Sequence, residues 1–95
     1  MHKALLLLKK IPRGKVTTYG ILAGLCKTSP RAIGRIMKYN EDPVNCPCYK
    51  VIKSSGEIGS YSVDGGIKAK INLLRKDGIK FVNGKVEKTY FHEFK

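Results

Sequence analysis

Two helix starts close together in the first half of the chain constrain the fold more than any other feature. Thr18 can accept hydrogen bonds from the first amides of a helix over residues 19–26. Ser29-Pro30 supplies the cap and the preset proline of another helix, and residues 27–28 form the turn between the two. Two short helices joined in this way predict a helix-turn-helix.

The second helix of this pair combines an apolar stripe with basic side chains. Its apolar residues recur at helical spacing at Ile33, Ile36 and Met37. Its basic residues are Arg31, Arg35 and Lys38. We interpret this helix as a basic recognition helix that contacts nucleic acid. The alternative is an ordinary helical hairpin whose basic face is solvated.

The whole chain, residues 1–95, is predicted to form one α/β domain that is mainly helical, because its length allows a single modest core. A first helix over residues 3–11 should end at Pro12, and an irregular connection should occupy residues 40–47. An extended run over residues 48–52 and a helix from Ile67 to Gly78 should follow. Asn83-Gly84 between two β-branched segments predicts a short C-terminal β-hairpin.

The charge of the chain points to a polyanionic partner. The sequence contains nineteen Lys and Arg residues and seven Asp and Glu residues, which gives a formal net charge of +12. Nucleic acid is the first candidate, an anionic membrane surface is the second, and a solvated lysine-rich surface is the alternative to both. No apolar run approaches the roughly 20 residues that span a bilayer, so we expect a soluble protein of the cytoplasm, or of the nucleus in a eukaryote.

The Cys46-Pro47-Cys48 segment is the densest group of reactive side chains in the sequence. A structural zinc site would need about four ligands, and Cys26, His2 and His92 are scattered without the spacing of a zinc motif, so we expect no metal and no cofactor. A disulfide between Cys46 and Cys48 would be strained. The segment therefore leaves two interpretations, a buried structural cysteine and a nucleophilic thiol.

Five motifs together resemble the C-terminal domain of O6-alkylguanine-DNA alkyltransferases over roughly residues 3–82. They are IPRGKVTTYG at 11–20, SPRAIGRIMKYN at 29–40, PCYKVI at 47–52, SSGEIGSYS at 54–62 and LLRKDG at 73–78. The resemblance implies a winged helix-turn-helix that enters the DNA minor groove and flips out a damaged guanine. It further implies that the O6-alkyl group is transferred to Cys48, once per molecule.

The resemblance also implies roles for individual residues. Arg31 would fill the space that the flipped base leaves, and Tyr19 would rotate the target phosphate and lie near the guanine ring. Ala32 and Gly34 would keep the recognition helix slim enough for a groove about 6 Å wide. Phosphate contacts would come from Thr18, Lys38 and Ser54. The base pocket would be lined by the main chain at Cys48 and Val51 and by Tyr61 and Ser62.

The chain departs from the family pattern at the active site. The family's PCHR motif is PCYK here, so Tyr49 replaces the histidine that relays a proton through water to a glutamate, and Asp77 stands at the glutamate position. Tyrosine is a poorer base than imidazole, and we expect slower transfer through a contact of Tyr49 with water and Asp77. Asn40 matches the asparagine that braces the active-site turn.

The family's N-terminal domain has no counterpart in the sequence. We expect its absence to expose residues 5–8, which would favour self-association or a fused or separate partner domain.

Two other functions remain open from the sequence. A non-catalytic sensor of alkylated DNA would share the fold, but such relatives commonly have tryptophan at the position of Cys48. A winged-helix regulator would instead read one undamaged sequence in the major groove. Taken singly, Arg31, Tyr19, Tyr61 and Asp77 could each have an ordinary surface or packing role.

Overall fold

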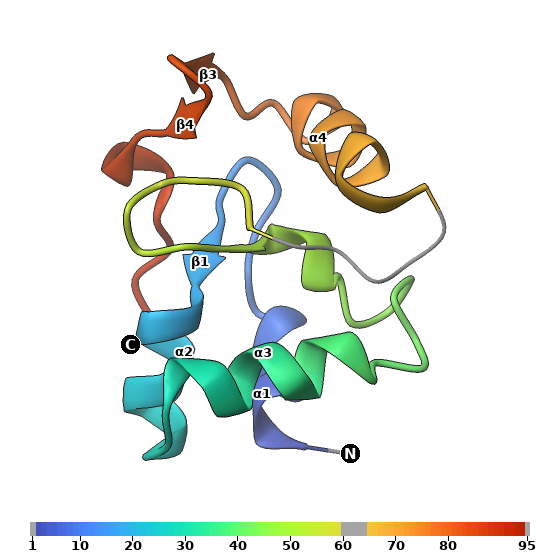
Figure 1. Ribbon diagram of the computed structural model, residues 1–95, viewed down its shortest axis with the longest axis vertical. Coiled ribbons are helices and arrows are strands. Elements are labelled where there is room, and N and C mark those ends of the chain that lie inside the picture. The colour runs from blue at the N-terminus through green and yellow to red at the C-terminus, as the bar shows by residue number, and fades with distance from the viewer. Residues whose placement is uncertain (1, 60–64, 95) are drawn as a thin grey trace.

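The computed structural model describes residues 2–59 and 65–94 of the chain, and Figure 1 shows their arrangement. Helices α1, α2 and α3 form one half of the molecule, and helix α4 and the C-terminal hairpin lie at the other. The helices are α1 (Lys3–Leu8), α2 (Tyr19–Cys26), α3 (Pro30–Lys38), α4 (Gly66–Lys76) and the 3₁₀ turns η1 (Cys48–Lys50) and η2 (Lys88–Tyr90). The strands are β1 (Thr17–Thr18), β2 (Val51–Ile52), β3 (Phe81–Val82) and β4 (Lys85–Val86).

The helix-turn-helix predicted from the two caps is confirmed. The Thr18 hydroxyl accepts a hydrogen bond of 3.0 Å from the Ile21 amide, and the Ser29 hydroxyl accepts one of 3.1 Å from the Ala32 amide. Lys27 ends α2 in the left-handed conformation, with φ of 54°. The sharp reversal at this residue lets α3 fold back against α2.

A short parallel strand pair places the Cys46–Cys48 segment beside the helix-turn-helix. Thr17 pairs with Val51 and Thr18 pairs with Ile52, so the strand that directly follows η1 is fixed to the strand that directly precedes α2. Both strands are fully buried. This pairing connects two parts of the chain that are distant in sequence, and it defines the position of Cys48 relative to Tyr19.

The buried side chains form two clusters on either side of this strand pair. The first contains Leu8, Leu22, Ile33 and Cys48 and joins α1, α2 and α3. The second contains Val16, Ile52, Leu74, Ile79 and Val86 and joins α4 to the hairpin. Val51 belongs to the first cluster and Ile52 to the second, because successive side chains of a strand point to opposite faces.

The predicted C-terminal hairpin is present as β3 and β4, and Asn83 and Gly84 both adopt positive φ in its turn. The hairpin packs closely on the loop after β2: the Val86 amide donates to the Gly56 carbonyl at 2.8 Å. A Cβ atom at Gly56 would lie only 2.5 Å from the Val86 carbonyl oxygen. Glycine is therefore required where this hairpin contacts the rest of the domain.

Three local expectations are wrong. The first helix ends at Leu8 rather than residue 11, because Lys9 and Lys10 continue as a turn. Residues 48–50 are a 3₁₀ turn rather than extended chain, and only Val51 and Ile52 form a strand. The expected exposure of residues 5–8 is confined to Leu6, since Leu8 is buried and Leu5 and Leu7 pack against the first cluster.

Among the described helices, none combines the length and the apolar character that crossing a membrane requires.

Candidate functional site

A cleft of about 740 Å³ opens between α2, α3 and the loop that follows β2. It brings together five residues to which the sequence assigned DNA contacts: Tyr19, Arg31, Gly34, Lys38 and Ser54. Pro30, Lys53 and Gly59 complete its described lining. The sequence reasoning missed Lys53, which follows the buried strand β2 directly and is exposed.

The cleft is positively charged. Arg31, Lys38 and Lys53 contribute three basic side chains, and the described lining contains no acidic one. Cations that line one cleft attract the phosphates of a nucleic acid backbone. Binding then releases the counterions of these phosphates, which favours the complex.

Three glycines keep the cleft open. A Cβ atom at Gly34 would meet nothing within 4 Å, so the face of α3 at this point is flat and free of protein. At Gly20 the added atom would lie 2.7 Å from the Ser54 hydroxyl oxygen, and at Gly59 it would lie 3.4 Å from the Tyr19 ring. Side chains at these positions would fill the cleft or displace the residues that line it.

Cys48 is the first residue of η1, and its side chain is only 4% exposed. It packs in the first core cluster and is not part of the described lining of the cleft. The main chain that carries it is held tightly, because the Cys46 carbonyl accepts hydrogen bonds of 2.8 Å from both the Cys48 amide and the Asn40 side-chain amide. Asn40 thus ties the end of the recognition helix to the turn before Cys48.

Lys70 is a buried lysine in this region that the sequence reasoning missed. Its side chain is 1% exposed, its ammonium donates a hydrogen bond of 2.6 Å to the Val51 carbonyl, and it lies 5.8 Å from the centre of the Tyr19 ring. Burial lowers the pKa of Lys70 to about 8, and the nearby Cys48 acts in the opposite direction. The signal in the sequence was its position on the apolar stripe of α4, between Ile67 and Leu74.

The expected contact of Tyr49 with Asp77 is replaced by a different arrangement. Asp77 forms an ion pair of 2.8 Å with Lys50 and accepts a hydrogen bond of 3.2 Å from the Gly14 amide. Lys50 also donates to the Pro12 carbonyl at 3.0 Å and lies 5.9 Å from the centre of the Tyr49 ring. Tyr49 itself packs against the second cluster, whereas Cys48 belongs to the first. The partner of the Asp77 carboxylate is therefore Lys50, whereas the sequence predicted Tyr49.

Two further site predictions need correction. Thr18 is 1% exposed and its hydroxyl caps α2, so its side chain cannot reach a phosphate. Val51 is fully buried and its carbonyl accepts the Lys70 ammonium, so it is not part of the described wall of the cleft. Ala32 lies half-buried on α3 beside Arg31. Tyr61 and Ser62 lie outside the described residues.

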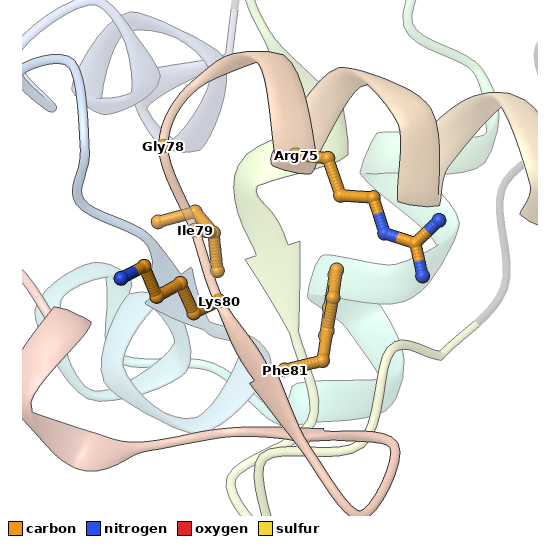
Figure 2. Close-up of a pocket in the computed structure, with 5 residues that line it drawn as sticks. All are labelled: Arg75, Gly78, Ile79, Lys80 and Phe81. Carbon is orange, nitrogen blue, oxygen red and sulfur yellow. The ribbon is translucent and has the colours of Figure 1, made fainter.

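A second pocket, of about 500 Å³, lies where α4 ends and β3 begins, and Figure 2 shows its lining. Arg75 lies over the Phe81 ring, 5.7 Å from its centre, and Gly78, Ile79 and Lys80 complete the wall. None of its lining residues is shared with the cleft. No group of three or more metal-ligating side chains occurs in the described part of the chain.

The fold and the basic cleft are those of a helix-turn-helix domain that binds DNA. A family model described as the DNA-binding domain of 6-O-methylguanine DNA methyltransferase matches residues 1–79, and the chain belongs to this family.

Relatives and solved structures agree with this assignment. A bifunctional methyltransferase/endonuclease of Picrophilus torridus is 50% identical over 84 residues, which are 85% of this chain and 27% of that protein. A methylated-DNA–protein-cysteine methyltransferase of Pyrobaculum aerophilum is 46% identical over 82% of this chain and 51% of its own length. The matched part of the chain therefore spans between about a quarter and a half of the length of these relatives.

The crystal structure of S. pombe Atl1 bound to damaged DNA containing O6-carboxymethylguanine superposes on the chain with a TM-score of 0.82. The two chains are 25% identical, and the match covers 96% of this chain and 92% of the other. The prediction of a small, mainly helical α/β domain of this family is thus confirmed.

Proposed function

We propose that this chain repairs DNA by transferring the alkyl group of an O6-alkylguanine to Cys48, in a single turnover. One observation supports this most directly: Tyr19, which lines the cleft, also packs against the buried cluster that contains Cys48. Tyr19 lines the cleft, and its ring lies against Lys70, which bonds to the strand that begins three residues after Cys48. In the proposed complex, a flipped base enters the cleft beside Tyr19 and meets the sulfur there.

In the proposed complex, α3 lies in the minor groove of double-stranded DNA. The open space at Gly34 lets the helix approach the base edges, and Arg31, which is exposed at the start of α3, inserts into the base stack. Lys38, Lys53 and Ser54 hold the backbone phosphates. Flipping the target base costs a few kcal/mol, and these contacts offset that cost.

The chemical step is an in-line displacement at carbon. The Cys48 thiolate forms a sulfur–carbon bond, the bond between that carbon and the guanine O6 breaks, and the electron pair stays on the guanine, which takes up a proton. The thioether is stable, so each molecule acts once. Asn40 serves this step as a positioning residue, because it fixes the Cys46 carbonyl and with it the turn that carries the sulfur.

Cys48 distinguishes this proposal from a sensor that binds alkylated DNA without repairing it. The sensor is the second candidate because the similarity to Atl1 extends over almost the whole chain. A sensor does not require a thiol on a braced turn, whereas alkyl transfer does.

The longer relatives suggest which partners the chain works with. Because the Picrophilus torridus relative joins a methyltransferase to an endonuclease, we propose that the domain works next to a further domain or a partner protein. Self-association through Leu6, which is 45% exposed, is the other arrangement that we expected from the sequence. The proposed substrate, O6-alkylguanine in DNA, implies a cytoplasmic or nuclear location.

Labelled DNA tests the proposal. A duplex with one O6-methylguanine carrying an isotopic methyl label is incubated with the protein, and the label on the protein is counted. Wild type should acquire it and Cys48→Ser should not. Cys26→Ser, which removes the half-buried thiol of α2, is the matched control and should behave as wild type. Equal labelling of wild type and Cys48→Ser, or none of either, would contradict the proposal.

A further inference from the structure

The pocket between the end of α4 and the start of β3 carries positive charge that the cleft does not account for. Its described lining contains no acidic side chain and consists of Arg75, Gly78, Ile79, Lys80 and Phe81. The pocket belongs to the half of the molecule that contains α4 and the hairpin, whereas the cleft lies against α2 and α3 (Figure 1). The pocket and the cleft are therefore two separate surfaces of one domain.

The exposed charges along the segment that forms this pocket are all basic. In residues 75–85 the exposed charged side chains are those of Arg75, Lys76, Lys80 and Lys85, which we call the second basic surface. The acidic residue of this stretch is Asp77, whose side chain is 9% exposed and is paired with Lys50. Cations in the last turn of a helix offset the helix dipole, but Lys80 and Lys85 lie beyond α4. The surplus of charge therefore favours an anionic partner.

Arg75 is held in a position that suits phosphate binding. Its guanidinium lies over the Phe81 ring, 5.7 Å from the ring centre, and Figure 2 shows the two side chains side by side. A guanidinium presents its N–H donors in a planar fork that matches the oxygens of a phosphate. Because the aromatic ring restricts the motion of this fork, less side-chain entropy is lost when a phosphate binds.

We propose that the second basic surface binds the phosphate backbone of a second DNA duplex, so that the domain holds two DNA segments at once. Duplex DNA carries one phosphate charge for about every 1.7 Å of its axis. Cations that point in different directions from one surface, as Arg75 and Lys80 do in Figure 2, therefore meet separate phosphates. Duplex DNA is favoured over an acidic protein because the chain belongs to a family of DNA-binding domains.

A second DNA-binding surface would serve the search for damaged bases. Backbone contacts that do not depend on sequence let a protein slide and hop along DNA. A domain with two such surfaces binds a second segment before it releases the first, and it therefore passes between segments without dissociating. This activity goes beyond alkyl transfer and does not depend on it, because it concerns undamaged DNA.

Fluorescence energy transfer between two duplexes measures this bridging. Short undamaged duplexes, one carrying a donor dye and the other an acceptor, are mixed with wild-type protein at about 50 mM salt. We expect energy transfer to rise until there is one protein for two duplexes. It should fall when the protein is in excess, because each duplex then binds its own protein. Bridging through self-association of the protein would persist in excess protein.

Charge-matched variants assign the bridging to the second basic surface. Arg75→Gln/Lys80→Gln removes two of its cations and changes no described lining residue of the cleft. Lys9→Gln/Lys10→Gln removes two exposed cations that follow α1 and line neither the cleft nor the pocket in the described part of the chain, so it is the control for net charge. Lys76→Gln/Lys80→Gln leaves the stacked arginine in place and provides the test if circular dichroism shows that the first variant is unfolded.

We expect Arg75→Gln/Lys80→Gln to bind the second duplex at least about tenfold more weakly than wild type at this salt concentration, because two phosphate contacts are lost. The control should bridge as wild type does. The inference is overturned by an absence of energy transfer in wild type, by transfer that persists in excess protein, by equal transfer in wild type and the variant, or by an equal loss in the control. Labelling of Cys48 by O6-methylguanine DNA is measured separately, so either proposal can fail while the other stands.

Discussion

Lys50 and Asp77 form an ion pair with 2.8 Å between Nζ and Oδ2, and their side chains are only 6% and 9% exposed. The lysine comes from the turn that carries Cys48, and the aspartate ends α4. The pair is also bonded to the connection between α1 and β1, through the Pro12 carbonyl and the Gly14 amide. It therefore holds three segments together, and one of them is the turn that carries Cys48.

Breaking this pair should destabilise the domain strongly. Lys50→Met leaves the Asp77 carboxylate buried without its cation, and we expect the free energy of unfolding to fall by roughly 3 kcal/mol. In Lys50→Met/Asp77→Asn no charge is left unpaired, so the double variant should lose less than the sum of the two single variants. Urea unfolding at pH 7 measures all three. Additive losses would mean that the two side chains do not interact.

The buried Lys70 should give the stability a characteristic pH dependence. Its pKa is lowered from 10.5 to about 8, so between these values the unfolded chain binds more protons than the folded one and the free energy of unfolding rises with pH. Relative to Lys70→Met, wild type should gain roughly 2 kcal/mol between pH 7 and pH 9.5. Parallel urea titrations of the two proteins test this. A constant difference would mean that Lys70 titrates normally.

Gly34 should control DNA binding without affecting the fold. Its added side chain would meet no protein atom within 4 Å, so Gly34→Leu should fold, but the leucine would occupy the space that the DNA needs. We expect the dissociation constant for duplex DNA to rise at least about tenfold, or 1.4 kcal/mol. Gly24→Leu is the control, since that position on α2 is equally open and does not line the cleft. Fluorescence anisotropy compares them, and equal affinities would contradict the proposed interface.

Restoring the family's histidine should not restore its proton relay. The carboxylate of Asp77 is engaged by Lys50 and Gly14, and residue 49 packs against the second cluster. Tyr49→His should therefore accelerate transfer far less than the roughly 100-fold that general acid–base catalysis can supply. Single-turnover rates with O6-methylguanine DNA decide this, and a gain of that size would revive the relay through residue 49.

The parts of the fold set by local signals could be predicted from the sequence. Thr18, Ser29-Pro30 and Asn83-Gly84 act within a few residues, and the helices and turn that they predict are present. The parts set by tertiary contacts could not. Thr18 is a cap rather than a phosphate contact because β1 is buried against β2. Asp77 pairs with Lys50 because the end of α4 meets η1, a contact between distant segments that no local pattern encodes.

In the candidate site, too, local patterns could be predicted from the sequence and tertiary contacts could not. Arg31, Gly34 and Lys38 lie on one helix, so helical spacing alone places them together, and they line the cleft. Lys70 escaped notice because a lysine on a helix is ordinarily solvated, and its burial follows from the packing of α4 against η1.

The central claim concerns one bond to one sulfur atom, and intact-mass spectrometry after incubation with unlabelled O6-methylguanine duplex tests it most directly. Peptide mapping then locates any added mass. The account predicts a gain of one methylene group per chain, carried by the peptide with Cys48, and an equal loss of O6-methylguanine from the DNA. An unchanged mass in protein that binds the damaged duplex would contradict it and would identify the domain as a sensor.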